Sequence, residues 1–273
     1  MKTLYSLFVT ALMLIAFACA ADAGTIAVET FDYAAGDGAL AGNSGGYGLA
    51  GSWTVSGSAY DIEDPVDKGW DDGTFGSPPL FPTDNMVSDD GNAGIASRDL
   101  AGGSYGATGE TYWYAAMVFS TNQTGEANGI GIQLTDGTSE IVSMKRAGSN
   151  AWLSAGASSA NGSSGLGTSN SERMRWLVMR IDYNTDTVGD VYMWVAPNFT
   201  DFTPADEPQI GDATLSLIDA PLSSFNTLQL DGGSQTNRVG QLRLATSWAA
   251  IPEPSTLVLL GLSGLLLLKR RRI

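Results

Sequence analysis

The chain has 273 residues, 34 of them glycine, and a formal net charge of −15 at pH 7. It contains no histidine and a single cysteine, which excludes a Ser-His-Asp triad, a Cys-His pair, histidine-ligated metals and a disulfide framework. The acidic charge of the body also disfavours nucleic acid and anionic membrane surfaces as partners, because it repels phosphate.

The N-terminus has the features of a secretory signal peptide. Lys2 precedes an apolar stretch at residues 4–18, and small residues follow up to Ala23. This order of charged region, apolar region and A-x-A site predicts a signal peptide at residues 1–23, with Gly24 as the first mature residue. The alternative is a lipoprotein signal acylated at Cys19, although Ala16 stands three residues earlier, where a large aliphatic residue is usual.

The body of the chain is predicted to be all-β. Its turn-rich composition favours strands over helices, and strand-like segments recur at residues 25–31, 52–62, 112–120, 129–134, 140–145, 174–183, 190–196, 225–230 and 239–244. The segments at 112–119 and 175–181 are continuously apolar or large, which is typical of central strands covered on both faces. Together these segments predict one antiparallel two-sheet sandwich at residues 24–248.

Two segments of the body are predicted to be loops. Residues 155–170 are too rich in Gly, Ser and Asn for a core and are expected to form a long surface loop. Residues 64–90 combine prolines and glycines with few strand formers, which favours a rim loop or a ligand-contacting insertion.

Two groups of oxygen ligands are candidates for a structural Ca²⁺ ion, the one cofactor that the residues suggest. The first has the spacing of a calcium loop without its glycine and final glutamate, and consists of Asp182, Asn184, Asp186 and Asp190. The alternative for this group is a plain hairpin turn between two strands. The second consists of Asp61, Glu63, Asp64 and Asp67, for which a solvated rim is the alternative.

Nothing in the body identifies a catalytic site. A glycosidase needs two carboxylates in a set geometry, and the compact Glu-x-Asp-x-x-Glu motif of jelly-roll glucanases is absent. Trp53, Tyr60, Trp70 and Tyr105 are candidates for exposed rings that stack on sugars, and the alternative is that they pack in the core or at its rim. The ligand itself is not indicated by any pattern.

The C-terminus combines three features in order. Pro252, Glu253 and Pro254 are followed by an apolar run at residues 257–268 and then by the basic cluster Lys269, Arg270, Arg271 and Arg272. Twelve helical residues at about 1.5 Å each fall short of a bilayer core of about 30 Å, so a short, transient membrane helix is expected. The basic cluster should stay cytoplasmic, which leaves the body on the exported side.

In these features residues 249–273 resemble the PEP-CTERM sorting signal of Gram-negative bacteria. The resemblance implies recognition by an exosortase-type transpeptidase, transient anchoring in the inner membrane, and transfer to the outer surface or the extracellular matrix. An ordinary Pro-rich linker before a membrane tail is the alternative.

The body resembles the concanavalin A-like and laminin-G-like jelly rolls that often precede such tails. The residues that carry this resemblance are Glu29-Thr30-Phe31-Asp32-Tyr33, Gly45-Gly46-Tyr47-Gly48, Trp53, the hairpin at 176–197 and the final strand with Trp248. In that final strand Gly240-Gln241 stands where the group often has an acidic pair.

The sequence therefore predicts an exported, non-catalytic surface or matrix protein that adheres to extracellular polysaccharide or to another component of the surface or matrix. A carbohydrate-active hydrolase or lyase, and a purely structural envelope component, are the two alternatives.

Overall fold

The computed structural model describes residues 24–33, 38–57, 60–63, 86–89, 91, 94–119, 123–164, 174–195 and 207–251. The predicted signal peptide, the Pro-Glu-Pro motif, the apolar run and the basic cluster lie outside these residues. Within the described ranges, no helix has the length and apolarity needed to span a bilayer.

The described chain forms two antiparallel sheets, as predicted for a sandwich. The larger sheet has nine strands, and eight of them follow the order β14-β13-β12-β7-β16-β5-β4-β2, with β1 paired to β16. Their bounds are β1 Thr25–Glu29, β2 Gly38–Ala39, β4 Asp61–Glu63, β5 Met86–Ser88, β7 Thr111–Phe119, β12 Met174–Thr185, β13 Val188–Val195, β14 Leu215–Pro221 and β16 Arg238–Ala245.

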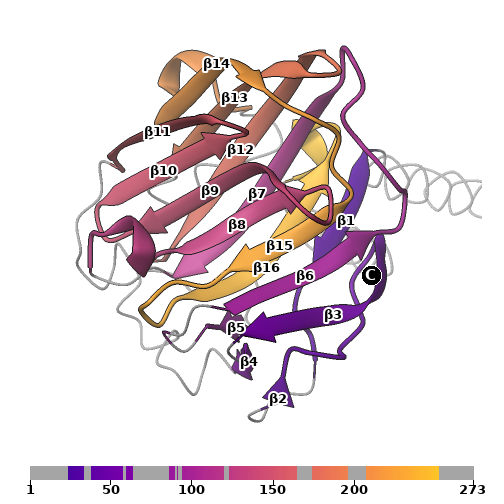
Figure 1. The fold of residues 1–273 in the computed structure, drawn as a ribbon, viewed down its shortest axis with the longest axis vertical. Helices are drawn as coiled ribbons and strands as arrows, with labels where there is room; N and C mark the ends of the chain where they lie inside the picture. Colours follow the sequence, from indigo (N-terminus) through magenta and orange to yellow (C-terminus); the bar gives the residue numbers. More distant parts are fainter. Residues whose placement is uncertain are drawn as a thin grey trace, which may run out of the picture.

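The smaller sheet has seven strands in the order β11-β10-β9-β8-β15-β6-β3. Figure 1 looks onto this sheet, and its strands follow one another in that order from the upper left to the lower right. Their bounds are β3 Leu49–Gly57, β6 Gly94–Leu100, β8 Ile130–Thr135, β9 Glu140–Ala147, β10 Asn150–Ala155, β11 Ser158–Ser163 and β15 Thr227–Asp231.

The main core lies between the two sheets. Alternate residues of each strand point inward, as the period of a β-strand requires, and large aliphatic side chains from both sheets meet there. Representative members are Leu134, Val142 and Leu153 from the smaller sheet and Leu177, Met179 and Ile181 from the larger sheet.

Strand β7 is buried along both faces, which confirms the expectation for its apolar segment. Its even-numbered residues, such as Tyr112 and Tyr114, join the core between the sheets. Its odd-numbered residues, such as Trp113 and Met117, join a separate cluster on the outer face.

The predicted loop at 155–170 is partly wrong, because residues 158–163 form β11. All six residues of β11 pair with β10 in a regular antiparallel register. The strand is partly exposed along its whole length, so its pairing depends on backbone hydrogen bonds and needs no apolar side chains. The predicted strand at 52–62 is instead divided between β3 in one sheet and β4 in the other.

A buried carboxylate ties the two sheets together near the N-terminus of the described chain. Glu29 on β1 is 1% exposed and accepts hydrogen bonds from Arg98 Nη1 at 2.9 Å, Trp53 Nε1 at 3.0 Å, Tyr33 Oη at 2.7 Å and the Phe31 amide at 2.8 Å. The donors come from β3, β6 and the turn after β1. The early residues that carry the jelly-roll resemblance therefore have a structural role here.

Candidate functional site

The outer face of the larger sheet has its own cluster of buried apolar side chains, which we call the outer cluster. Most of its members lie on the central strands or just after β16, and they are Met86, Trp113, Ala115, Met117, Trp176, Val178, Tyr192, Trp194, Ala245, Trp248, Ala250 and Ile251. A two-layer sandwich needs only one apolar face on each sheet. Four tryptophans on the second face are therefore more than the core requires.

The strand register aligns polar and aromatic side chains in two neighbouring rows on this outer face. Residues that face each other across antiparallel strands lie on the same side of a sheet. One row consists of Tyr192, Arg180 and Trp113, and the other of Asp190, Asp182 and Thr111.

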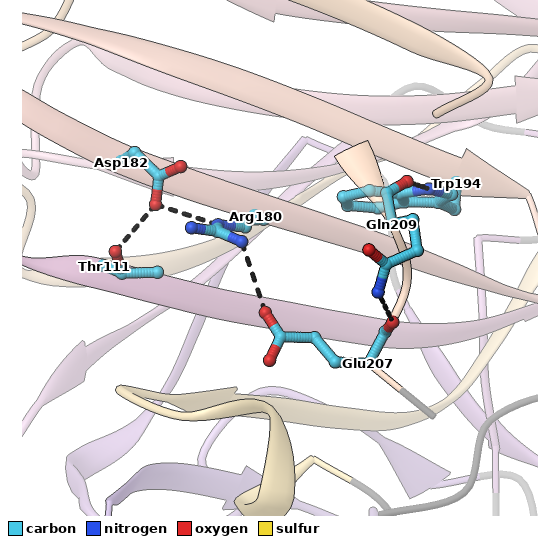
Figure 2. A network of polar contacts seen from close by, with 6 residues as sticks. All are labelled: Thr111, Arg180, Asp182, Trp194, Glu207 and Gln209. Carbon is cyan, nitrogen blue, oxygen red and sulfur yellow. Dashed lines mark hydrogen bonds and ion pairs between the residues drawn. The ribbon is translucent and has the colours of Figure 1, made fainter. Parts of the chain in front are cut away.

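Arg180 is at the centre of this arrangement (Figure 2). Its Nε donates to Asp182 Oδ1 at 2.9 Å and its Nη1 donates to Glu207 Oε1 at 3.2 Å. Its guanidinium carbon lies 5.5 Å from the centroid of the Trp113 ring, within the range of a cation-π contact. Asp182, Glu207 and the Trp113 ring therefore hold the guanidinium group from three sides. Thr111 Oγ1 donates to the same Asp182 oxygen at 2.7 Å and so fixes the carboxylate.

The polar groups of this network are accessible to solvent, whereas its aromatic rings are not. The side chains of Arg180, Asp182 and Glu207 are 23%, 20% and 49% exposed, while Trp113 and Trp194 are 2% and 6% exposed. The aromatic rings therefore act as a rigid support, and the polar groups are the ones available for a ligand.

The segment after residue 206 covers one side of the support. Trp194 Nε1 donates to the Gln209 carbonyl at 3.2 Å, and the Gln209 side-chain amide donates to the Glu207 carbonyl at 2.9 Å. These two bonds hold the backbone of Glu207 above the sheet and so help to place its carboxylate against Arg180 (Figure 2).

Tyr192 lies beside Arg180 and keeps its proton at neutral pH. Burial raises the pKa of its hydroxyl, the negative charges of Asp190 and Asp182 raise it further, and Arg180 opposes them. The Tyr192 hydroxyl is thus a hydrogen-bond donor in this site and is poorly suited to act as a base.

The structure shows separate partners for the acidic residues of the first calcium candidate. Asp182 is bound by Arg180 and Thr111, Asp186 accepts hydrogen bonds from the amide and hydroxyl of Thr108, and Asp190 Oδ1 accepts the Asp219 amide at 2.9 Å. Residues 186 and 187 form a two-residue turn between β12 and β13, which is the plain hairpin expected as the alternative. Among the described residues, no three Asp, Glu, Cys or His side chains are grouped closely enough to hold a metal ion.

The second calcium candidate is only half described. Asp61 and Glu63 lie on β4, and Glu63 forms an ion pair with Arg238. Asp64 and Asp67 lie outside the described residues, so a structural Ca²⁺ at this loop stays a prediction.

Two of the aromatic residues considered for sugar stacking are buried instead. Trp53 is 2% exposed and binds Glu29, while Tyr60 is 0% exposed and donates from its hydroxyl to the Gly94 carbonyl at 2.8 Å. Both rings therefore pack in the core, as the alternative to sugar stacking predicted. Tyr105 is partly buried and stacks on Phe225 with ring centroids 5.7 Å apart. Trp70 lies outside the described residues.

Gly240 and Gln241 occupy an irregularity of the last strand. The register of β16 against β7 shifts between Val239 and Leu242, and a Cβ atom on Gly240 would lie 2.3 Å from Met117 Cε. Met117 Cε is the flexible end of a side chain in the outer cluster, so a side chain at position 240 would require Met117 to move.

The residues that form the polar network were largely missed by reasoning from the sequence. Asp182 was identified, but as a calcium ligand, and Arg180, Glu207 and Tyr192 were not identified. The available signal was the continuous run of large residues at 175–181, which indicated that something covers the outer face of that strand.

Comparison with solved structures gives similar sandwiches at low identity. The chain is similar to the botulinum neurotoxin serotype D binding domain, with 11% identity, a TM-score of 0.43, and coverage of 83% of this chain and 49% of that one. It is also similar to an alginate lyase of Polysaccharide Lyase family 7, with 11% identity, a TM-score of 0.35 and coverage of 70% and 78%. A protein of unknown function from Shewanella oneidensis MR-1 has 6% identity, a TM-score of 0.39 and coverage of 74% and 81%.

The chain spans about half the length of the neurotoxin domain, and at these scores the similarities carry no argument about activity. No curated protein matches the chain.

Comparison with family models identifies the end of the chain. Residues 250–272 match the PEP-CTERM protein-sorting motif, which confirms the resemblance that Pro252, Glu253 and Pro254 carry. The match also implies processing by an exosortase. The chain is therefore an exported protein with a PEP-CTERM sorting motif at its C-terminal end.

Proposed function

We propose that this protein is a non-catalytic component of the outer surface or extracellular matrix of a Gram-negative bacterium, where it binds a glycan. The binding site in this proposal is the polar network around Arg180 on the outer face of the larger sheet. The observation that carries the proposal is that this network is partly exposed and is fixed on a buried aromatic support.

The chemistry of the network suits sugar hydroxyl groups, which both donate and accept hydrogen bonds. Asp182 and Glu207 offer carboxylate acceptors, while Arg180 offers donors. Because each group is already held by its neighbours, little side-chain entropy is lost when a ligand binds.

The local charge favours a neutral glycan over an anionic one. Arg180 is accompanied by three carboxylates, from Asp182, Asp190 and Glu207, and the whole chain has a net charge of −15. A polysaccharide that carries carboxylate or sulfate groups would be repelled from this face.

The same groups support binding without turnover. Tyr192 keeps its proton, the carboxylates of Asp182 and Glu207 are both paired with Arg180, and the chain has no histidine to serve as a base. Incubation with a labelled glycan should therefore yield no shorter fragments, and fragments that disappear in the Glu207→Gln variant would contradict the non-catalytic part of the proposal.

Affinity electrophoresis of the folded protein in gels that contain neutral or anionic polysaccharides tests the binding site. The Arg180→Gln variant should weaken binding of a neutral glycan by about tenfold or more, since a hydrogen bond to a charged group contributes roughly 1.5–3 kcal/mol. A Gln229→Ala variant is the control, because Gln229 is partly exposed on β15 in the opposite sheet. Equal retardation of both variants and the unmodified protein, or no retardation of any of them, would reject the site.

A further inference from the structure

The sorting motif begins inside the folded sandwich. The match starts at residue 250, and Ala250 and Ile251 are 7% and 5% exposed members of the outer cluster. The first two residues of the motif are therefore packed against the sheet, and the next residue in the chain is Pro252.

Specific contacts hold this segment, residues 247–251, which we call the latch. The Trp248 ring lies 5.1 Å from the Trp113 ring, measured between centroids. Arg243 Nη1 donates to the Ile251 carbonyl at 3.1 Å, and the Ile251 amide donates to the Trp248 carbonyl at 2.9 Å. The peptide carbonyl that immediately precedes Pro252 is thus bound to strand β16.

The base of the latch is held from its other side by the beginning of the described chain. Thr25 on β1 faces Ala245 on β16, and the Thr246 amide donates to the Gly24 carbonyl at 2.7 Å. The latch therefore leaves from a fixed corner of the sandwich, where both ends of the described chain meet.

We propose that the latch controls the sorting reaction, and that the exosortase engages Pro252, Glu253 and Pro254 only after the latch has been released from the sheet. An enzyme that cleaves a peptide chain needs several consecutive residues free of other contacts, so cleavage beside a packed segment follows the fraction of molecules in which that segment is open. Trp248 and Arg243 are positioning residues in this proposal. The proposal that the latch controls sorting depends on the sorting motif and is independent of glycan binding.

Two variants of the full chain separate release of the latch from simple loss of stability. A Gly-Ser-Gly-Ser spacer inserted between Ile251 and Pro252 keeps every residue of the latch and adds four residues between the latch and Pro252. Trp248→Ala removes the ring that packs on Trp113. The control is Trp152→Ala, because Trp152 is a partly exposed tryptophan on β10 of the opposite sheet.

Pulse-chase labelling in the native host, read by mass spectrometry, gives the rate at which the C-terminal tail is lost. The spacer and Trp248→Ala variants should both lose the tail several-fold faster than the unmodified protein, and Trp152→Ala should match it. The spacer variant should also keep the melting temperature of the unmodified protein. Hydrogen exchange at its Ile251 amide should remain as slow as in the unmodified protein.

The proposal fails if the spacer leaves the rate of tail loss unchanged or lowers it while the unmodified protein is processed normally. It also fails if the Ile251 amide of the unmodified protein exchanges without protection. A tail that persists in every form would reject exosortase processing as well, so the two failures are distinguishable.

Discussion

At the residue scale, the most consequential side chain of the sandwich is Glu29. It is 1% exposed and paired with Arg98, whose side chain is 3% exposed. The ion pair is compensated because Trp53, Tyr33 and the backbone of Phe31 donate to the same carboxylate. A buried charge without its partner is strongly unfavourable, so this position should tolerate little change.

Substitution Glu29→Gln keeps the size of the side chain and removes the charge that balances Arg98. We expect the free energy of unfolding to fall by about 3–5 kcal/mol, measured by urea denaturation of the folded domain. The matched control is Asp32→Asn, which neutralises an exposed acid three residues away and should change stability by no more than about 0.5 kcal/mol. Similar losses in the two variants would show that the buried pair has no special role.

The site was less predictable than the fold at this scale. Asp182 was identifiable as part of an acidic hairpin, and Arg180 is its neighbour two residues earlier on the same strand, but Thr111 meets it only through the register of β7 against β12. Glu207 reaches the network from a separate segment before β14. Neither the register nor the position of that segment can be read from local patterns, which is why the network was missed.

At the scale of elements, strands with apolar alternation or long apolar runs were predictable, whereas polar and short strands were not. Strand β8 was expected from its alternating residues and is present. Strand β11 consists of Ser, Ala, Asn and Gly, and β14 contains Asp219 and Pro221. Such edge strands are stabilised mainly by backbone pairing with one neighbour, so their side chains give little signal.

Glycines near β1 explain part of the early motif. The backbone of Tyr47 exchanges hydrogen bonds with Val28 at 2.8 and 3.0 Å. Gly48 next to it has φ +69°, and a Cβ atom at this position would lie only 1.7 Å from the Ile26 carbonyl oxygen. Gly51 has a similar φ of +64° but no heavy atom within 4 Å of its Cβ position.

This pair of glycines gives a test of close packing at β1. Gly51→Ala should cost about 1–2 kcal/mol, the usual penalty for the left-handed conformation. Gly48→Ala should cost clearly more, because the methyl group also collides with the backbone of β1. Thermal denaturation of both variants measures the difference, and equal melting temperatures would contradict the close approach of residues 26 and 48.

At the scale of the whole molecule, the two ends of the described chain meet at one corner of the sandwich. The Thr246 amide binds the Gly24 carbonyl at 2.7 Å, and Arg243 binds the Ile251 carbonyl at 3.1 Å. Gly24 is the predicted first residue after the signal peptide, and residue 250 begins the sorting motif. Both processing events are therefore expected at the same corner, while the polar network around Arg180 remains on the outer face of the larger sheet.

The most direct test of this account is intact-mass spectrometry combined with cell fractionation of the protein from its native host. The unmodified protein is compared with a variant that carries Pro252→Ala and Pro254→Ala. We predict that the mature unmodified chain begins at Gly24, lacks the residues that follow the Pro-Glu-Pro motif and is found outside the inner membrane, while the variant keeps its tail and stays in that membrane. An intact tail and the same location for both forms would contradict the account.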